Sequence, residues 1–304
     1  MLEIDDLTVW MGEPYIINDK IKVLQPIIRD ILNFGEREYF SVVQTLCSTS
    51  SNMKSQLADN GIDWETVEDF QMFMMLAPSL NVEKTHLVLG DIDLSNFKIF
   101  QNKENDEVVM ADTENNIVID RLIYMRIVEY LRKVHGLTRA HDVTKSKFVH
   151  DMAIEMEREE VETNAKKPYK SFLWPLISSI KARQGYTKQY VLDMQIYELI
   201  HEVNRLQIIV QSDALLQGSY SGMVDTKKLP KEQFNWMRDI ELNEHSGQQL
   251  NEGTYQCTFY IFKILFYWRK KLWLLQLGHY LGNAHSSLHW ETLQCIPSNM
   301  LERP

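Results

Sequence analysis

The chain has 304 residues, enough to bury a sizeable core as one large domain or as two smaller ones. Hydrophobic residues at 44% and charged residues at 24% are ordinary for a folded globular protein and argue against bulk disorder. The formal net charge of −10 disfavours a general nucleic-acid binder, because phosphate contacts need a clustered basic face, so we expect no nucleic-acid partner.

The cysteines and the N-terminus indicate the compartment. Cys47, Cys257 and Cys295 are too few and too scattered for a disulfide framework or a four-thiolate metal site, and they fit a reducing cytoplasm. The first ten residues carry three acidic side chains and no basic one, so they do not resemble a signal peptide. We expect the protein to stay in the cytoplasm where it is made.

Residues 1–83 are expected to form an N-terminal unit that begins with a β-hairpin. Loose alternation of apolar residues over 2–25, with a turn-forming Asn18-Asp19 pair, predicts this hairpin. The period then changes, and helices are expected at 26–35, 36–46 and 52–61. Pro26 suits the first position of the first of these helices.

Residues 63–77 are expected to form one further helix, with Asp63 as its N-cap and acidic residues in its first turn. The end of this helix is strongly apolar and rich in methionine. Because methionine adapts to irregular surfaces, the end could be a partner-binding patch, although filling the core is the commoner use of such residues. The candidate contacts are Met72, Phe73, Met75 and Leu76.

Residues 84–120 are expected to form a small antiparallel β meander. Apolar runs separated by turn formers occur at 87–89, 97–100, 108–110 and 117–119. The connecting loops are acidic, but the ligand spacing of a calcium loop is absent, so we interpret the acidic residues as solvated turns. These residues are Asp91, Asp93, Glu104, Asp106 and Asp112.

Residues 121–240 are expected to be helical. A helix at 121–134 has basic residues near its end, followed by Gly136. A charged helix at 144–165 carries Glu155 and Glu159 one turn apart. We interpret it as a solvated face and not as a paired-carboxylate site, because nothing in the sequence indicates the desolvated setting that acid–base catalysis needs.

The longest predicted element is a helix from Asp193, its N-cap, to Leu216, which Gly218 would end. It is expected to continue from a helix at 171–182 and to organise the packing. Its apolar stripe is either all core or partly turned toward a client helix. In the second case, changing Tyr197 and Ile200 to Ser would cost binding more than stability. The candidate contacts on this stripe are Tyr197, Ile200 and Val203.

Residues 231–240 add Phe234 and Trp236 as candidate partner contacts. The composition then changes near Glu241. Residues 241–304 hold five acidic and five basic residues, so the first 240 carry the whole imbalance (27 − 37 = −10). We treat 241–304 as an atypical hydrophobic and basic C-terminal extension.

The most hydrophobic stretch, residues 257–282, lies in this extension. Lys263 and the basic cluster at 269–271 interrupt it, which leaves apolar runs too short to span a membrane. It could lie on a membrane surface or bind a partner, but a core or docking segment is the simpler interpretation, and we do not expect a membrane partner.

No catalytic signature stands out, so we expect no enzyme and no cofactor. The sequence lacks GxGxxG, GxxxxGK[ST], GxSxG and CxxC motifs, and Cys47 is expected to be a buried helix residue. His285 and His289 have the spacing of one helix face, but further ligands are missing, so no metal site is predicted. His135, His141 and His150 likewise have no metal-ligand pattern around them.

Four stretches resemble a known family. They are GEPYIINDKIKVLQPIIRDILNFGEREYF, SNMKSQLADNGIDWETVEDFQMFMMLA, NNIVIDRLIYMRIVEYLRKVHG, and KPYKSFLWPLISSI with the long helix up to GSYSGMVDTKK. They resemble tail-assembly chaperones of phages and prophages of Gram-positive bacteria, over about residues 1–240. The resemblance is one of pattern and includes no catalytic motif.

The resemblance implies a non-enzymatic role in the host bacterial cytoplasm. Such chaperones bind the tape-measure protein and recruit tail-tube subunits, and a longer form made by ribosomal frameshifting would suit the break near Glu241. Self-association stays open. The alternatives are a structural virion protein of the tail or the head–tail junction, and an effector whose extension touches a host membrane. The predicted fold class is α+β, predominantly α-helical with a small antiparallel β meander and an N-terminal β-hairpin.

Overall fold

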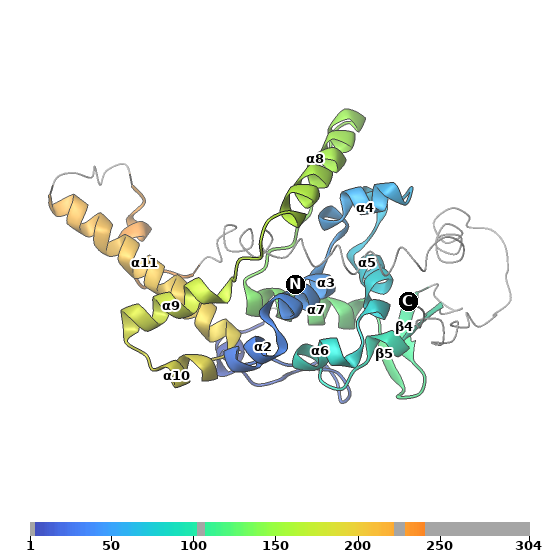
Figure 1. The fold of residues 1–304 in the computed structure, drawn as a ribbon, viewed down its shortest axis with the longest axis horizontal. Helices are drawn as coiled ribbons and strands as arrows, with labels where there is room; N and C mark the ends of the chain where they lie inside the picture. The colour runs from blue at the N-terminus through green and yellow to red at the C-terminus, as the bar shows by residue number, and fades with distance from the viewer. Residues whose placement is uncertain (1–3, 102–106, 222–228, 241–304) are drawn as a thin grey trace.

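A computed structural model describes residues 4–101, 107–221 and 229–240 (Figure 1). The predicted fold class is confirmed: helices dominate, and the strands of the described residues form a two-stranded hairpin and a three-stranded antiparallel sheet. The predictions for the extension at 241–304, including His285, His289, Cys257 and Cys295, lie outside the described residues. So do Glu104 and Asp106.

In chain order, the helices and strands are α1 (Asp6–Met11), β1 (Tyr15–Ile16), β2 (Lys22–Val23), α2 (Ile28–Phe34), α3 (Glu36–Cys47), α4 (Lys54–Asp59), α5 (Asp69–Leu76), α6 (Val82–Leu89), β3 (Lys98–Gln101), β4 (Val108–Asp112), β5 (Ile117–Ile119), α7 (Arg121–His135), α8 (Lys147–Ala165), α9 (Leu173–Gln184), α10 (Lys188–Asp193) and α11 (Ile196–Tyr220). Short 3-10 turns are η1 (Ser50–Asn52), η2 (Trp64–Thr66), η3 (Ala77–Ser79), η4 (Leu94–Asn96) and η6 (Lys231–Phe234).

The N-terminal hairpin is confirmed, but it is shorter than predicted because α1 precedes it. The side chain of Asp5 accepts a hydrogen bond from the Thr8 backbone N–H at 3.0 Å, and Gly12 ends α1 in the left-handed region at φ 69°. These two caps define a helix where the loose alternation of apolar residues suggested a strand. Strands β1 and β2 then pair across the predicted turn.

Two local predictions were wrong for the same reason. Residues 63–77 do not form one helix, because Glu68 starts α5 with a capping box in which its backbone N–H donates to the Gln71 side chain at 2.9 Å. Residues 87–89 are not a strand: they lie in α6, which Asn81 caps and Gly90 follows. A short apolar run has no period long enough to distinguish helix from strand, so the caps decide.

The meander of β3, β4 and β5 is confirmed, with Ile99, Met110 and Ile119 in register across the sheet. Met110 and Ile119 are fully buried, and β5 packs against α7. Asp112 does stabilise a turn, since it accepts the backbone N–H of Glu114 at 2.9 Å, but the expectation that it is solvated was wrong, because its side chain is buried. The side chain of Asp93 likewise caps the turn η4.

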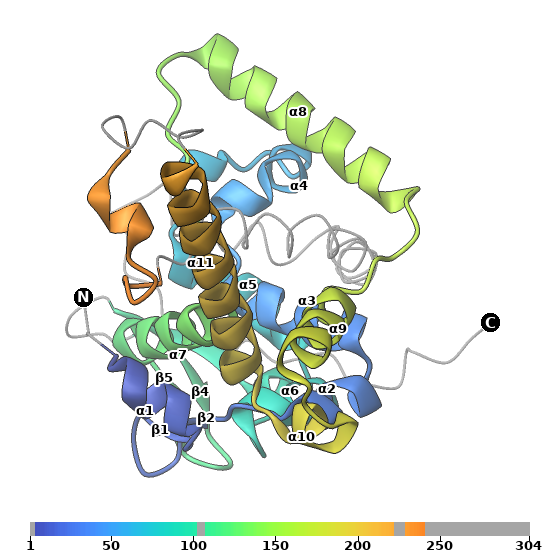
Figure 2. The ribbon, with the colours of Figure 1, turned by 90° about the vertical axis from the view of Figure 1, so that its left-hand side faces the viewer.

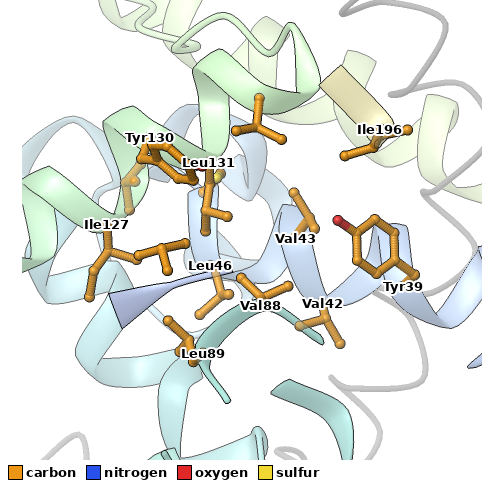
Figure 3. Packing of buried hydrophobic residues seen from close by; sticks show 14 of the residues in the cluster. Tyr39, Val42, Val43, Leu46, Val88, Leu89, Ile127, Tyr130, Leu131 and Ile196 are labelled. Carbon is orange, nitrogen blue, oxygen red and sulfur yellow. The ribbon is translucent and has the colours of Figure 1, made fainter. Parts of the chain in front are cut away.

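The main core joins α2, α3, α6, α7 and the start of α11, and Figure 3 shows Tyr39, Leu46, Tyr130 and Ile196 packed in it. A second, smaller cluster lies under α4, α5, η2 and α8. Its fully buried members include Trp64 and a methionine on either side of it in the sequence. The larger cluster therefore holds the body of the protein, and the smaller one attaches α8.

The longest helix, α11, corrects three predictions. It begins at Ile196 with Gln195 as the N-cap residue, because Asp193 belongs to α10, where its carboxylate lies 2.7 Å from the Arg29 guanidinium. Helix α11 also continues through Gly218, since one glycine costs only about 1 kcal/mol in a helix. It does not continue from α9, because α10 intervenes and α9 packs beside α11 (Figure 2).

The other helices fit the predicted ranges closely. Helices α3 and α7 occupy the predicted positions, and α7 ends at Gly136 in the left-handed region. Helix α2 starts at Ile28 and not at Pro26, whose carbonyl accepts the backbone N–H of Ile196 at 3.3 Å.

Among the described residues, no helix combines the length and the apolar character that crossing a membrane would require.

Candidate partner-binding surface

Helix α8 lies at the outer edge of the molecule in both views (Figures 1 and 2). The side chain of Ser146 caps its first turn, and its main packing partner is the short helix α4. Apart from contacts of its first turn with η2, the side of α8 that faces away from α4 is largely exposed in the part of the chain that the structure describes. The chemistry of its two faces therefore decides what α8 can do.

The inner face of α8 packs on α4. Ile154 and Val161 are buried there, and Glu157 accepts the backbone N–H of Ser55 at 2.5 Å. Burial raises the pKa of the Glu157 carboxyl above its usual value. Arg158, at the edge of this face, pairs with Asp59 of α4 at 2.5 Å.

The outer face of α8 carries a row of large apolar side chains. Phe148, Met152 and Met156 recur at four-residue steps and are 76%, 51% and 60% exposed. Val149 is also exposed beside them. Steps of four place side chains on one side of a helix, so these four residues form a continuous patch, the α8 stripe. A contiguous exposed apolar patch marks an interaction site more often than scattered apolar residues do.

The charge around the α8 stripe restricts its partner. Helix α8 carries six acidic and two basic side chains, a net charge of −4 (2 − 6), and Asp151, Glu155 and Glu159 are exposed beside the stripe. An apolar row with acidic flanks complements an amphipathic helix that has basic flanks.

The first turn of α8 is fastened to η2 by a second set of contacts. The ring of His150 stacks on Trp64 with centroids 5.4 Å apart, and its Nε2 lies 3.2 Å from Asp63 Oδ1. Glu65 accepts both the N–H and the hydroxyl of Thr144 at 2.7 Å. These two hydrogen bonds are the first cause of the lowered pKa of the Glu65 carboxyl. The stripe is therefore held in a fixed orientation.

Three of these residues, Asp63, Glu65 and His150, bring potential metal-ligand atoms within 4.8 Å of one another. Their oxygens and ring nitrogens already serve local contacts, since Asp63 caps η2 by accepting the Glu65 backbone N–H at 3.0 Å. The cluster is a clamp between η2 and α8. Sequence reasoning left His150 unmatched because its partners are distant in the chain.

The predicted methionine patch on α5 is not at the surface. Met72, Phe73 and Leu76 are buried and Met75 is half-buried, since α5 lies between the two core clusters. Phe73 packs on Tyr124 with ring centroids 4.9 Å apart. Met72, Phe73 and Leu76 are therefore not available at the surface, and the core interpretation holds for them.

The candidates on α11 are also mostly inside. Tyr197 and Ile200 are 6% and 5% exposed, and Val203 is partly buried against the same cluster. Their side of α11 faces the body because α1, α7 and α9 pack on it. In the segment after α11, Phe234 is half-buried and Trp236 is 51% exposed.

Sequence reasoning missed the α8 stripe although its signal was present. The four-residue steps from Phe148 to Met156 are visible in the sequence, but the surrounding acidic residues suggested a solvated face. The sequence also carries a second apolar row, with Ile154 and Val161. Only the placement of α4 shows which of the two rows is covered.

The other reactive side chains serve the core. Cys47 is buried, as predicted, and burial raises the pKa of its thiol to about 12, so the thiol stays protonated. His135 is buried, with its Nε2 2.7 Å from the Tyr39 hydroxyl and its Nδ1 2.7 Å from the Leu131 carbonyl. Both groups are satisfied within the core.

The fold and this surface define a mainly helical protein whose clearest exposed feature is an apolar stripe on an outlying helix. Residues 166–241 match the family model described as the second domain of YomV. This is a phage-type family, and the match supports a phage-related protein. The matched segment contains α9, α10, α11 and η6, and it ends at the change in composition near Glu241. No curated protein and no solved structure matches the chain.

Proposed function

We propose that the chain is a tail-assembly chaperone of a phage or prophage that acts in the host bacterial cytoplasm. It binds amphipathic helices of the tape-measure protein along the α8 stripe and recruits tail-tube subunits. The match to the phage-type family supports the phage setting, and the resemblance in the first 240 residues suggests the tail-assembly role. The proposal includes no catalytic step, cofactor or metal.

The single observation that carries this proposal is the exposed α8 stripe. An aggregation-prone client needs apolar surface to bind and charge to keep the complex soluble. The stripe supplies the apolar surface, and the acidic side chains beside it supply the charge.

The expected affinity for one client helix is modest. Burying a large apolar side chain contributes about 1.5–3 kcal/mol at most, and these side chains are already partly covered. Loss of translational and rotational freedom on association offsets several kcal/mol of that gain. Weak single contacts suit a chaperone that must release its client, and several copies along one long client would add avidity.

The test is co-expression of the full chain with the tape-measure protein of the same phage. The stripe variant carries Phe148→Ser, Met152→Ser and Met156→Ser. The control variant carries Leu7→Ser, Leu122→Ser and Met125→Ser, three exposed apolar residues on α1 and α7. We expect the stripe variant to lose at least about tenfold in recovered tape-measure protein, equivalent to about 1.4 kcal/mol, and the control to lose little. Equal recovery with both variants would exclude the stripe as the binding surface.

Mass spectrometry of purified virions separates this role from that of a structural virion protein. A chaperone leaves the assembled tail, so peptides of this chain should be absent or rare. Abundant peptides at a fixed ratio to the tail-tube subunit would overturn the proposal in favour of a component of the tail or the head–tail junction.

A further inference from the structure

A pocket of about 310 Å³ lies where α1 meets α11 and the connection between α9 and α10. Its volume falls at the lower end of the range of about 300–1,000 Å³ that small-ligand sites occupy. The side chains around it are mixed in character, with two aromatic rings, an acid, a histidine and an arginine among them. The chemically distinctive lining residues are Trp10, Tyr186, His201, Glu202 and Arg205.

The carboxylate of Glu202 lines this pocket and has no cationic partner among the described residues. Its Oε2 is buried and has no hydrogen-bond partner, and its Oε1 is 3.5 Å from the Tyr186 hydroxyl, the limit of a hydrogen bond. A buried carboxylate oxygen without a partner is costly, so this position favours a ligand that donates hydrogen bonds or carries positive charge. Burial also raises the pKa of the Glu202 carboxyl, because the charged form loses solvation in the pocket.

Arg205 does not supply the missing charge, although it lies one helical turn from Glu202. Its Nη1 donates to the carbonyls of Trp236 at 2.9 Å and Arg238 at 2.7 Å. The guanidinium thus fastens the segment after η6 to α11. No ion pair with Glu202 occurs in the part of the chain that the structure describes.

Aromatic faces complete a setting for a cation. Trp10 is 51% exposed and lines the pocket, and Tyr186 packs on Tyr190 with ring centroids 4.7 Å apart. Aromatic faces attract ammonium and guanidinium groups, with tryptophan the strongest of them. Aromatic rings beside an unpaired carboxylate are the combination that recognises an arginine or lysine side chain.

Trp10 lies outside the family-matched segment, and contacts from that segment hold its helix in place. Helix α1 is tied to α11 by the Tyr197 hydroxyl, which donates to Asp6 at 3.3 Å, and by the Gln195 side chain, which donates to the Gly12 carbonyl at 3.1 Å. The segment at 166–241 therefore provides the acid, and the N-terminal helix provides the tryptophan.

We propose that this pocket binds the cationic side chain of an arginine or lysine in a peptide, with the carboxylate of Glu202 as the charge partner and Trp10 as the aromatic face. The proposal stands independently of the α8 stripe. A peptide cation in the pocket supplies a charge partner for the Glu202 carboxylate and leaves the contacts of Arg205 intact.

The test uses the full chain and two capped tripeptides, acetyl-Gly-Arg-Gly-amide and its citrulline counterpart, which has nearly the same shape without the charge. The readout is the indole N–H resonance of Trp10 in a nitrogen–proton spectrum, assigned with Trp10→Phe. We expect the arginine peptide to shift this resonance with a dissociation constant of about 1 mM or tighter, and the citrulline peptide to leave it unchanged. No shift with arginine, or an equal shift with citrulline, overturns the proposal.

Matched variants locate the interaction. Glu202→Gln should weaken binding of the arginine peptide at least about tenfold, since it removes the charge and keeps the shape. Asp213→Asn, an exposed acid on the same helix, should not change it. Trp10→Ala should weaken binding when it is followed through the peptide's own signals, whereas Trp174→Ala, an exposed tryptophan on α9 that does not line the pocket, should not. Binding by Glu202→Gln equal to that of the unaltered chain would overturn the assignment.

Discussion

The backbone N–H of Ile28 donates to the carbonyl of Met194 at 2.9 Å, which joins the start of α2 to the residue that follows α10. Ile27 and Gln195 form an antiparallel bridge beside this bond. The same junction brings Ile196 into the core cluster that holds Ile28. The family-matched segment therefore shares one core with the N-terminal part of the chain.

From this junction we expect a fragment of residues 166–240, made alone, to lack a stable fold. The fragment would lose the N-terminal part of the core cluster that contains Leu173, Ile180 and Ile196, each 0% exposed in the full chain. Each such side chain contributes about 1.5–3 kcal/mol of burial, against a total stability of about 5–15 kcal/mol for a domain. Thermal unfolding followed by circular dichroism should show a cooperative transition for residues 1–240 and none for the fragment. A cooperative transition at a similar temperature in both would contradict this expectation.

The burial of Ile200 reverses the expectation that its change to Ser would cost binding more than stability. Ile200→Ser removes a buried side chain and leaves a hydroxyl in an apolar site, so we expect a loss of about 2–5 kcal/mol in the free energy of unfolding. The control is Val210→Ser on the same helix. Val210 is 47% exposed, and its change should stay within about 0.5 kcal/mol. Urea denaturation measures both, and equal losses would show that α11 does not face the core here.

Local signals in the sequence were enough to predict most of the helices. Helix α7 could be predicted at both ends, because Asp120 caps it by accepting the Ile123 backbone N–H at 2.7 Å and Gly136 follows it. Predictions failed where a period was short or a cap was overlooked, as at residues 87–89 and at Glu68. Caps and periods are local, so the sequence contains them in full.

The two surfaces could not be predicted in the same way. Phe148 and Ile154 belong to two apolar rows of one helix, and which row is buried depends on α4, about a hundred residues earlier. Trp10 and Glu202 line the same pocket only because α1 folds onto α11. Such long-range pairings leave no trace in local composition, which is why the methionines of α5 could be interpreted from the sequence either as core or as a partner-binding patch.

The buried pair of His135 and Tyr39 should make the fold sensitive to acid. A carbonyl only accepts, so Nδ1 of His135 carries the proton that goes to Leu131, and Nε2 accepts the hydroxyl of Tyr39. Burial lowers the pKa of His135 from 6.5 to about 4. The unfolded chain therefore takes up the proton first, and folding stability should fall as pH drops from 6.5 to 4, by up to about 3 kcal/mol.

Urea denaturation across this pH range measures the effect. In the paired variant His135→Phe with Tyr39→Phe, the titrating group and the hydroxyl that it satisfies are both removed, so this part of the pH dependence should disappear. Tyr39→Phe alone keeps the buried histidine and should keep the loss at acidic pH. If the paired variant lost as much stability as the unaltered chain between pH 6.5 and 4, His135 would not be the responsible group.

Glu157 decides how firmly α8 rests on α4, and its effect on stability has the opposite dependence on pH. Burial raises the pKa of its carboxyl above the usual 4.5, so the folded state favours the protonated form. The contact between α8 and α4 is therefore most stable near or below pH 4.5, where the carboxyl is protonated. Its stability falls as pH rises through the folded pKa of Glu157. Hydrogen exchange of the α8 amides, corrected for intrinsic rates, should therefore show greater protection at about pH 5 than at about pH 7.

Two substitutions at this position separate the charge from the hydrogen bond. Glu157→Gln keeps an acceptor for the Ser55 N–H without the charge. The α8 amides of this variant should be at least as protected as those of the unaltered chain at about pH 7, and their protection should depend less on pH. Glu157→Ala leaves that N–H without a partner and should weaken the contact by about 1–3 kcal/mol. Should the two variants protect α8 equally, the hydrogen bond from Ser55 would contribute nothing, and packing of Ile154 and Val161 alone would hold the helix.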